Sequence, residues 1–304
     1  MKDAKRVLVA LDLTAFDDEV IKYASYFCPL VGAEEVYFLH VDNSFYTPND
    51  FPERLREEFV PMDEGEKAII EDKVKEAFTG SSANIHVNVL EGEPINVLAH
   101  TIETKGIDLV IAGLKEKKEH LSILPYKIAR KSTASVLFVP SGVSNSIKNI
   151  VLPFDFSSHS KEAIEFCQTV SDKTFGVSTK MLHVYQIPTG YYKTGKSYEE
   201  MNAIMLQHKQ EGLAETMKAY DGFEHSVEMY PTEKGSVSQQ LTSELGEEKP
   251  DLLVMGSKGQ TNSAAIMLGS MAESVITSYR NSPVLIIKKK GENKSLLQAF
   301  FDFL

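Results

Sequence analysis

The sequence repeats itself, and this repeat constrains the fold more than any other feature. RVLVALDLT near the start matches NIVLPFDFS in the middle, FLHV matches MLHV, and IDLVIAG matches PDLLVMG. The residues paired by these matches are Asp12 with Asp155, His40 with His183, and Asp108 with Asp251. Because each pair lies 143 positions apart, the sequence predicts a duplicated domain, with each copy occupying about half of the 304-residue chain.

Each copy alternates short apolar runs, typical of strands buried in a parallel sheet, with amphipathic stretches typical of helices. In the first copy we expect strands at 6–11, 35–41, 84–90, 109–112 and 135–139, and helices at 17–30, 64–78 and 94–105. In the second copy we expect strands at 150–154, 178–185, 226–230, 252–255 and 284–288, and helices at 158–173, 198–220, 237–245 and after residue 269. This alternation predicts an α/β fold with a doubly wound parallel sheet in each copy.

A small polar linker, SGVSNS at 141–146, separates the two copies. We therefore expect one domain at 1–142, a second at 147–289 and an amphipathic C-terminal tail at 290–304. The tail is expected to pack against its own chain or a second subunit, because its apolar residues recur at helical spacing. These residues are Leu296, Leu297, Phe300, Phe301 and Leu304.

Composition is that of a globular protein, with 42% hydrophobic and 25% charged residues. A formal net charge of −11 argues against a nucleic-acid partner, since phosphate backbones are bound by clustered Lys and Arg. The apolar runs are too short to cross a membrane, and no signal-peptide pattern precedes the first strand, so we expect a cytoplasmic protein. The basic run at 288–290 is interpreted as a solvated strand edge, and Cys28 and Cys167 as buried thiols.

The strand expected at 252–255 leads into a loop with regularly placed glycines. Gly256, Gly259, Gly269 and Ser270 have the spacing G-x2-G-x9-G-S. Glycines allow backbone amides to approach a bulky anion, and Ser270 is expected to cap a helix whose N-terminus favours negative charge. A phosphate fits this pattern. Alternatively, the glycines only form turns after the strand.

This strand, loop and helix resemble the nucleotide loop of the ATP-binding branch of the universal stress protein family, and the resemblance covers nearly the whole chain except the tail. It implies two tandem five-stranded domains of the adenine-nucleotide alpha-hydrolase-like type, with strand order 3-2-1-4-5. In such a sheet, ligands bind beyond the carboxyl ends of the strands where the winding reverses, between the first and fourth strands. The resemblance also implies pairing between the last strands of the two copies, at 136–139 and 284–287, and allows a homodimer.

The resemblance assigns site residues in the second copy only. It places adenosine against Pro153, Phe154, Asp155 and the backbone of Val184. It places the phosphates after Met255, on Gly256, Ser257, Lys258, Gly259, Gly269, Ser270 and Met271. Asp155 would accept hydrogen bonds from ribose or hold a hydrated Mg²⁺, and Lys258 would offer a positive charge to phosphate. Asp155 is equally explained as the aspartate before a helix that Ser157 or Ser158 caps.

The first copy departs from this pattern. Ala112 and Gly113 are followed by Leu114, Lys115 and Glu116, so a carboxylate replaces the second glycine, and Leu121 with Ser122 stands where the second copy has Gly269 with Ser270. A carboxylate repels phosphate, and a leucine prevents close backbone approach. We expect no nucleotide in the first copy.

A competing motif lies at 190–197, where GYYKTGKS matches G-x4-G-K-S. Against a P-loop, Ile187 and Pro188 separate it from the preceding strand, and the first copy has no counterpart. Lys193 or Lys196 would still be able to reach the phosphates of the other site. The eight histidines show no zinc-type spacing, so we expect no metal held by the protein alone.

The sequence therefore predicts a stress-response protein that binds ATP, with Mg²⁺ held through the phosphates. Any hydrolysis, or self-phosphorylation at Ser257 or Ser270, is expected to be slow, because no general base is evident. Two alternatives remain. One is a nucleotide-hydrolysing or adenylate-forming enzyme on the same fold, although the SGGxDS and HxGH motifs of such enzymes are absent from the sequence. The other is a scaffold that binds no nucleotide.

We expect one ATP site per chain. Isothermal titration calorimetry of the full chain with ATP should give a stoichiometry near one, because only the second copy has the glycine loop. Two sites of equal affinity would contradict the interpretation of Glu116 and Leu121.

Overall fold

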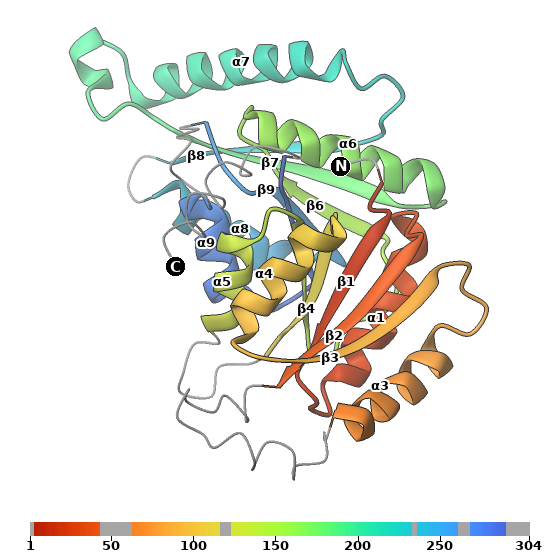
Figure 1. Cartoon of the computed structure of the whole chain (residues 1–304). Helices are drawn as coiled ribbons and strands as arrows, with labels where there is room; N and C mark the ends of the chain where they lie inside the picture. Colours follow the sequence, from red (N-terminus) through yellow and green to blue (C-terminus); the bar gives the residue numbers. More distant parts are fainter. Residues whose placement is uncertain (1–2, 43–62, 116–122, 233–235, 261–267, 290–304) are drawn as a thin grey trace, which may run out of the picture. The chain divides into compact units, whose positions relative to one another are not determined.

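A computed structural model describes residues 3–42, 63–115, 123–232, 236–260 and 268–289. Contacts between Cα atoms divide the chain into two compact units that meet between Asn145 and Ser146. We call the unit from Asp3 to Asn145 the first domain and the unit that begins at Ser146 the second domain. Each is an alternation of strands and helices (Figure 1).

The elements of the first domain follow the expected order, with one addition. They are β1 (Arg6–Leu11), α1 (Asp17–Leu30), β2 (Glu35–Asp42), α3 (Asp63–Ala77), β3 (Asn84–Glu91), α4 (Pro94–Lys105), β4 (Leu109–Leu114), α5 (Ile123–Lys131) and β5 (Ser135–Pro140). Helix α5 was not expected, because the sequence before it differs from the glycine loop used to place the matching helix of the second copy.

The second domain repeats this order. Its elements are β6 (Asn149–Pro153), α6 (Ser158–Lys173), β7 (Ser178–Gln186), the 3-10 helix η1 (Tyr191–Thr194), α7 (Tyr198–Met217), β8 (Ser226–Thr232), α8 (Val237–Glu248), β9 (Leu252–Gly256), α9 (Ser270–Ser278) and β10 (Val284–Ile287). In Figure 1 the long helix α7 lies on the outer side of α6 in the same domain. It has no buried residue.

Each domain has the strand order that the family resemblance implied. In the first domain the order is β3-β2-β1-β4-β5, and all neighbours run parallel. The second domain has the equivalent order β8-β7-β6-β9-β10, again with parallel neighbours. Helices α1 and α3 contact each other in the first domain, as do α4 and α5. The expected 3-2-1-4-5 topology is therefore confirmed.

Local sequence signals explain where several helices begin. Helix α4 has Pro94 in its first turn, and the Glu93 carboxylate accepts from the amide of Asn96 (2.9 Å). Ser157 caps α6 by accepting from the amide of Ser160 (3.1 Å). The expected cap of α9 is wrong, because Ser270 is its first residue and the N-cap is Gly269, which has no side chain. The first amides of α9 are therefore not satisfied by a side-chain cap.

Burial agrees with the cysteine prediction and corrects the basic run. Cys28 and Cys167 are buried free thiols, and burial raises the pKa of the Cys28 thiol to about 12. Lys288 is only 5% exposed, so its interpretation as a solvated edge residue is wrong, whereas Lys289 is exposed. Strand β10 pairs with β9 as far as Ile287, and Lys288 follows this buried strand directly.

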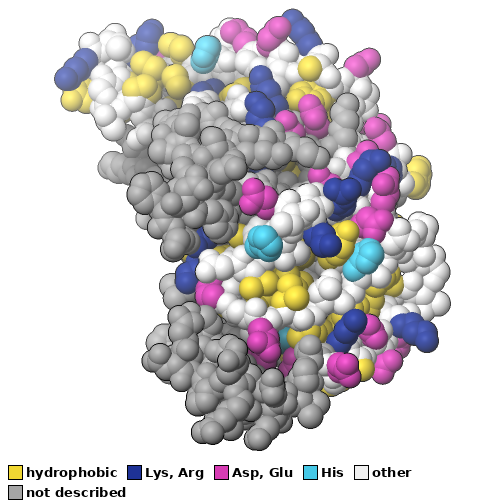
Figure 2. Space-filling model, in the orientation of Figure 1, with side chains coloured by type: hydrophobic (Ala, Val, Ile, Leu, Met, Phe, Trp, Pro, Cys, Tyr) yellow, Lys and Arg dark blue, Asp and Glu magenta, His cyan; other side chains and the backbone are white. Residues whose placement is uncertain are grey.

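No helix in the described part of the chain is long and apolar enough to span a membrane. On the face drawn in Figure 2, lysine and arginine side chains are interspersed with aspartate and glutamate. That face therefore presents mixed charge rather than one continuous basic patch of described residues.

Gly256 ends β9 and lies against His159 of α6. A Cβ at Gly256 would lie 2.7 Å from Cβ of His159 and 2.8 Å from its carbonyl carbon. Gly256→Ala should therefore lower the free energy of unfolding by about 1–3 kcal/mol, the usual range for overpacking, as measured by urea unfolding.

The matched control is Gly246→Ala in α8, where a Cβ would meet nothing within 4 Å. This change should raise stability by about 0.5–1 kcal/mol, since alanine is the better helix former. Equal effects of the two substitutions would contradict the close packing of α6 on β9.

Candidate functional site

The strand order places the carboxyl ends of β6 and β9 side by side in the second domain. Val151 of β6 is in register with Leu253 of β9, and both strands run toward the same edge. The segment after β6 carries Asp155, and the segment after β9 carries the predicted glycine loop. Two segments about one hundred residues apart in sequence thus meet where the winding of the sheet reverses, which is where α/β sheets bind ligands.

The glycine loop packs directly on Asp155. A Cβ at Gly259 would lie 2.9 Å from Oδ2 of Asp155, and Nε2 of Gln260 donates to the Asp155 backbone carbonyl (2.6 Å). The amide of Gly269 donates to the carbonyl of Ser257 (2.8 Å), and a Cβ at Gly269 would lie 3.3 Å from Cα of Lys258. Glycines are therefore needed here for close approach of backbone and carboxylate, beyond simple turn formation.

Asp155 is half-buried and accepts from the amide of Ser157 (3.0 Å). Ser157 in turn caps α6. The sequence left open whether Ser157 or Ser158 caps this helix. The cap is Ser157, whereas Ser158 is the first helical residue and is exposed. Among the described residues, no lysine or arginine forms an ion pair with the Asp155 carboxylate.

The other predicted residues lie near the ends of β6 and β7, beside an aromatic cluster. Phe154 is buried, and the rings of Phe154 and Phe156 are 4.7 Å apart, while those of Phe156 and His183 are 4.9 Å apart. Strand β6 pairs with β7 as far as Pro153 and Leu182. Val184 lies beyond that pair, so its peptide group extends past the end of β6.

His183 connects the ends of these two strands. Its Nδ1 donates to the carbonyl of Phe154 (2.6 Å), and burial lowers the pKa of the imidazole, with a further contribution from the positive charge of Lys209. Its Nε2 is buried without a hydrogen-bond partner among the described residues. In the first domain His40 makes the same contact with the carbonyl of Leu11 (3.1 Å), which explains why the LHV segment recurs.

Helix α7 reaches the aromatic cluster through three contacts that the sequence did not reveal. Nζ of Lys209 lies 5.5 Å from the centre of the Phe156 ring, and a Cβ at Gly212 would lie 3.4 Å from the same ring. The hydroxyl of Tyr185 donates to Oδ1 of Asn202 (2.7 Å). The sequence carried no signal for these three residues of α7, because they belong to no glycine loop and the helix has no apolar face.

Two buried lysines lie beside the glycine loop. Lys258 and Lys288 are each 5% exposed. Burial, together with the positive charge of Lys258, lowers the pKa of Lys288 to about 7. The amide of Ser257 donates to the carbonyl of Ile287 (2.9 Å), which ties the loop to the end of β10. Lys288 is a residue near the predicted phosphate positions that the sequence interpretation missed.

The remaining predicted phosphate contacts surround the start of α9. Met255 is buried at the end of β9, Ser257 is 2% exposed, and Gly256 is half-buried. Ser270 is exposed and Met271 half-buried in the first turn of α9. Within the described ranges, no group of three or more His, Cys, Asp or Glu side chains is placed to hold a metal ion.

The segment that matches a P-loop does not form an anion cradle. Residues Tyr191–Thr194 form η1, and Ser197 caps α7 in a capping box with Glu200. The Ser197 hydroxyl accepts from the Glu200 amide (3.2 Å), and the Glu200 carboxylate accepts from the Ser197 amide (2.8 Å). The carboxylate thus occupies a position that a phosphate would need, while Lys193 and Lys196 are exposed.

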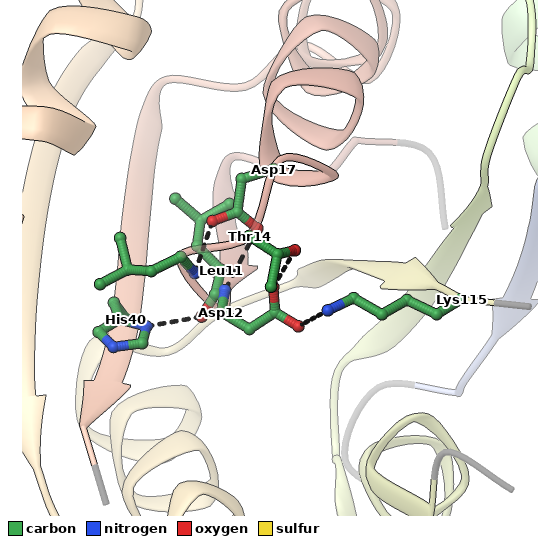
Figure 3. Close-up of polar contacts among 7 residues, drawn as sticks. Leu11, Asp12, Thr14, Asp17, His40 and Lys115 are labelled. Carbon is green, nitrogen blue, oxygen red and sulfur yellow. Dashed lines mark hydrogen bonds and ion pairs between the residues drawn. The ribbon is translucent and has the colours of Figure 1, made fainter. Parts of the chain in front are cut away.

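The equivalent point in the first domain carries an ion pair (Figure 3). Asp12 pairs with Nζ of Lys115 and accepts from the Thr14 hydroxyl (2.7 Å). Burial raises the pKa of Asp12, but hydrogen bonds from Lys115 and Thr14 outweigh it and lower that pKa overall. Glu116, Leu121 and Ser122, on which the sequence comparison of the two loops depends, lie outside the described residues.

Asp17 supports the loop that carries Asp12. Its carboxylate accepts from the amides of Asp12 (3.2 Å) and Leu13 (2.8 Å), and Leu13 has a left-handed φ of 56°. Burial raises the pKa of Asp17 to about 6, aided by the negative charge of Asp12 and opposed by the two backbone hydrogen bonds. At the matching position the second domain has Ser160, which carries no charge.

Comparison with known proteins gives one family. The model of the Universal stress protein family matches residues 4–140 and again residues 146–288. Universal stress protein MJ0531 of Methanocaldococcus jannaschii is 30% identical over 148 residues, which are 48% of this chain and 84% of that protein.

Solved structures show the same fold over the whole chain. A universal stress protein from Archaeoglobus fulgidus matches with a TM-score of 0.66 and 19% identity, covering 95% of this chain and 99% of that one. A functionally unknown protein, PA1789 from Pseudomonas aeruginosa, matches with a TM-score of 0.68 and 13% identity, covering 99% and 98%. At these identities the likeness shows the fold alone.

Asp17 should titrate near pH 6. Its pKa is higher in the folded protein than the ordinary value of 3.8, so its contribution to stability is fully present below about pH 3.8 and is lost as the pH rises through about 6. The carboxyl carbon of Asp17, followed by NMR, should show a midpoint near 6. In Asp17→Asn the stability should depend less on pH between about 4 and 6. A midpoint near 3.8 would contradict the effect of burial.

Proposed function

Because this chain belongs to the universal stress protein family and contains two copies of its domain, we propose that the second domain binds ATP and that the first domain does not. The protein then responds to adenine-nucleotide levels as a binding protein in stress signalling. The proposal rests on the resemblance of the glycine loop and on the arrangement of residues around Asp155.

One contrast between the domains carries this proposal. Asp155 is free of cationic partners among the described residues and is in contact with Gly259, whereas Asp12, its counterpart, is paired with Lys115. A ribose hydroxyl or a hydrated Mg²⁺ can bind Asp155 without breaking an ion pair. At Asp12 the same ligand would have to displace Lys115, at the cost of a charge-assisted hydrogen bond.

Each predicted contact then has a physical role. The base lies against Pro153 and Phe154 and reaches the peptide group of Val184 beyond the end of β6. Phosphates approach the backbone at Gly256, Gly259 and Gly269, where side chains are absent. The start of α9 offers amides without a side-chain cap at Ser270 and Met271. Lys258 and Lys288 are buried next to Ser257, and a bound phosphate would favour the charged form of Lys288, whose pKa is otherwise lowered to about 7.

Mg²⁺ would reach this site through the phosphates, with Asp155 as a protein carboxylate suited to a hydrated ion. The residues around the loop supply binding and positioning groups, and His183 has its pKa lowered and its Nδ1 engaged by Phe154. Slow hydrolysis or self-phosphorylation at Ser257 or Ser270 is compatible with this site. Steady-state turnover faster than about 1 s⁻¹, the lower range for ordinary enzymes, would instead favour the enzyme alternative.

Gly259→Glu should abolish nucleotide binding. It introduces the residue type that the first copy has at Glu116 and places its carboxylate next to Asp155. We expect ATP affinity to fall by about 100-fold or more, because repulsion between the new carboxylate and the nearby phosphate oxygens costs several kcal/mol. Calorimetric titration of the full chain measures the change.

The matched control is Lys196→Ala in the P-loop-like segment, which should leave ATP affinity within about twofold of the wild type, because Lys196 is exposed. The reverse result, with binding lost in Lys196→Ala and retained in Gly259→Glu, would place the nucleotide at residues 190–197 and overturn the proposal.

A further inference from the structure

The first domain contains a cavity at its own switch point, beside the Asp12 and Lys115 ion pair. Its volume is about 120 Å³. Ala10 of β1 and Ala112 of β4 form its floor, and Leu98 of α4 and Ile128 of α5 are among the apolar side chains that line it. It lies where the fold places ligands, although the nucleotide loop is not present in this copy.

Two small residues explain why space remains there. Ala10 and Ala112 are in register on neighbouring strands, so their side chains project from the same face of the sheet. The residues at the matching positions of the second domain are Pro153 and Met255, and both are larger. The first domain therefore has less side-chain volume at the ends of its central strands. The two alanines are the feature of the sequence that indicates this space.

The polar groups that line the cavity are largely satisfied by one another. Asp12 is paired with Lys115, the Asp17 carboxylate accepts two backbone amides, and Nδ1 of His40 donates to the Leu11 carbonyl (Figure 3). With Nδ1 engaged, Nε2 is the ring nitrogen of His40 through which a ligand could be bound. The two carboxylates disfavour an anion, and the lysine is already neutralised by Asp12.

We propose that this first-domain cavity binds a small uncharged ring compound that carries one hydrogen-bond donor. The cavity volume of about 120 Å³ is somewhat below the roughly 150 Å³ of an apolar cavity that binds benzene, so the size suits a single ring and no larger group. Apolar side chains such as Leu98 and Ile128 contact the faces of the ring, and the donor of the ligand bonds to His40. The two carboxylates disfavour the phosphates of a nucleotide. This site is independent of nucleotide binding in the second domain.

Phenol is a suitable probe, since it combines one aromatic ring with one hydroxyl donor. Methyl groups of the full chain are labelled with ¹³C, and phenol is titrated to millimolar concentrations. Saturable shifts are expected at Val41, Leu98 and Ile128. Benzoate, an anion of similar size, should bind about tenfold more weakly or not at all. If phenol produces no saturable shift at these methyl groups, the proposal is wrong.

Two variants test the location. Ala112→Met introduces the residue that the second domain carries at this position, and it should weaken phenol binding at least about tenfold because it fills the floor of the cavity. Leu98→Ala enlarges the cavity and should increase binding of indole, a two-ring donor, by about tenfold relative to the wild type. Undiminished phenol binding in Ala112→Met, or no gain for indole in Leu98→Ala, would overturn the assignment.

The same spectra separate this proposal from the nucleotide proposal. ATP should leave the methyl groups of Leu98 and Ile128 unshifted, while phenol should shift them whether or not ATP binds the second domain. Shifts of Leu98 and Ile128 that ATP produces and phenol does not would assign the cavity to nucleotide and contradict the proposal. Loss of ATP binding in Gly259→Glu with phenol binding unchanged would show that the two sites are separate.

Discussion

Parallel pairing of the first strand of each domain with the second and fourth strands is the constraint on which both sites depend. Because β1 pairs with β2 and β4, and β6 with β7 and β9, the carboxyl ends of these strands meet at one edge of each sheet. The histidine of each LHV segment reinforces this edge by donating to the carbonyl of Leu11 or Phe154. Loops that are distant in sequence are thereby held within hydrogen-bond distance.

The two domains use this shared frame differently, and the difference is one of charge and volume. In the first domain, Lys115 neutralises Asp12, and Ala10 with Ala112 leaves a small cavity. In the second domain, Gly259 packs against Asp155, while Met255 provides a larger side chain at the position of Ala112. A duplicated domain can in this way keep its topology while its copies differ in charge and volume at this edge, because the sheet does not depend on the loops beyond it.

Elements with strong local signals were predicted well. The strands and helices such as α1, α4 and α6 follow from apolar periodicity, capping residues and the repeat, whereas the strand order follows from the family resemblance. Errors arose where a residue's role depends on partners distant in sequence. Ser270 looked like a cap but is the first residue of α9, and Lys288 looked like an edge residue but is buried beside Lys258. Neither outcome can be read from neighbouring residues.

The sequence by itself determined the duplication, the α/β class, the family resemblance and the positions of the glycine loop, because these depend on composition and spacing along the chain. Only the tertiary structure decided which groups meet at the sheet edges: Lys115 with Asp12, Gly259 with Asp155, and Lys209 with Phe156. The cavity of the first domain is likewise visible only in the tertiary structure. Charge pairing and packing volume depend on distances between side chains from separate elements, and those distances are set only when the strands pair and the helices pack on them.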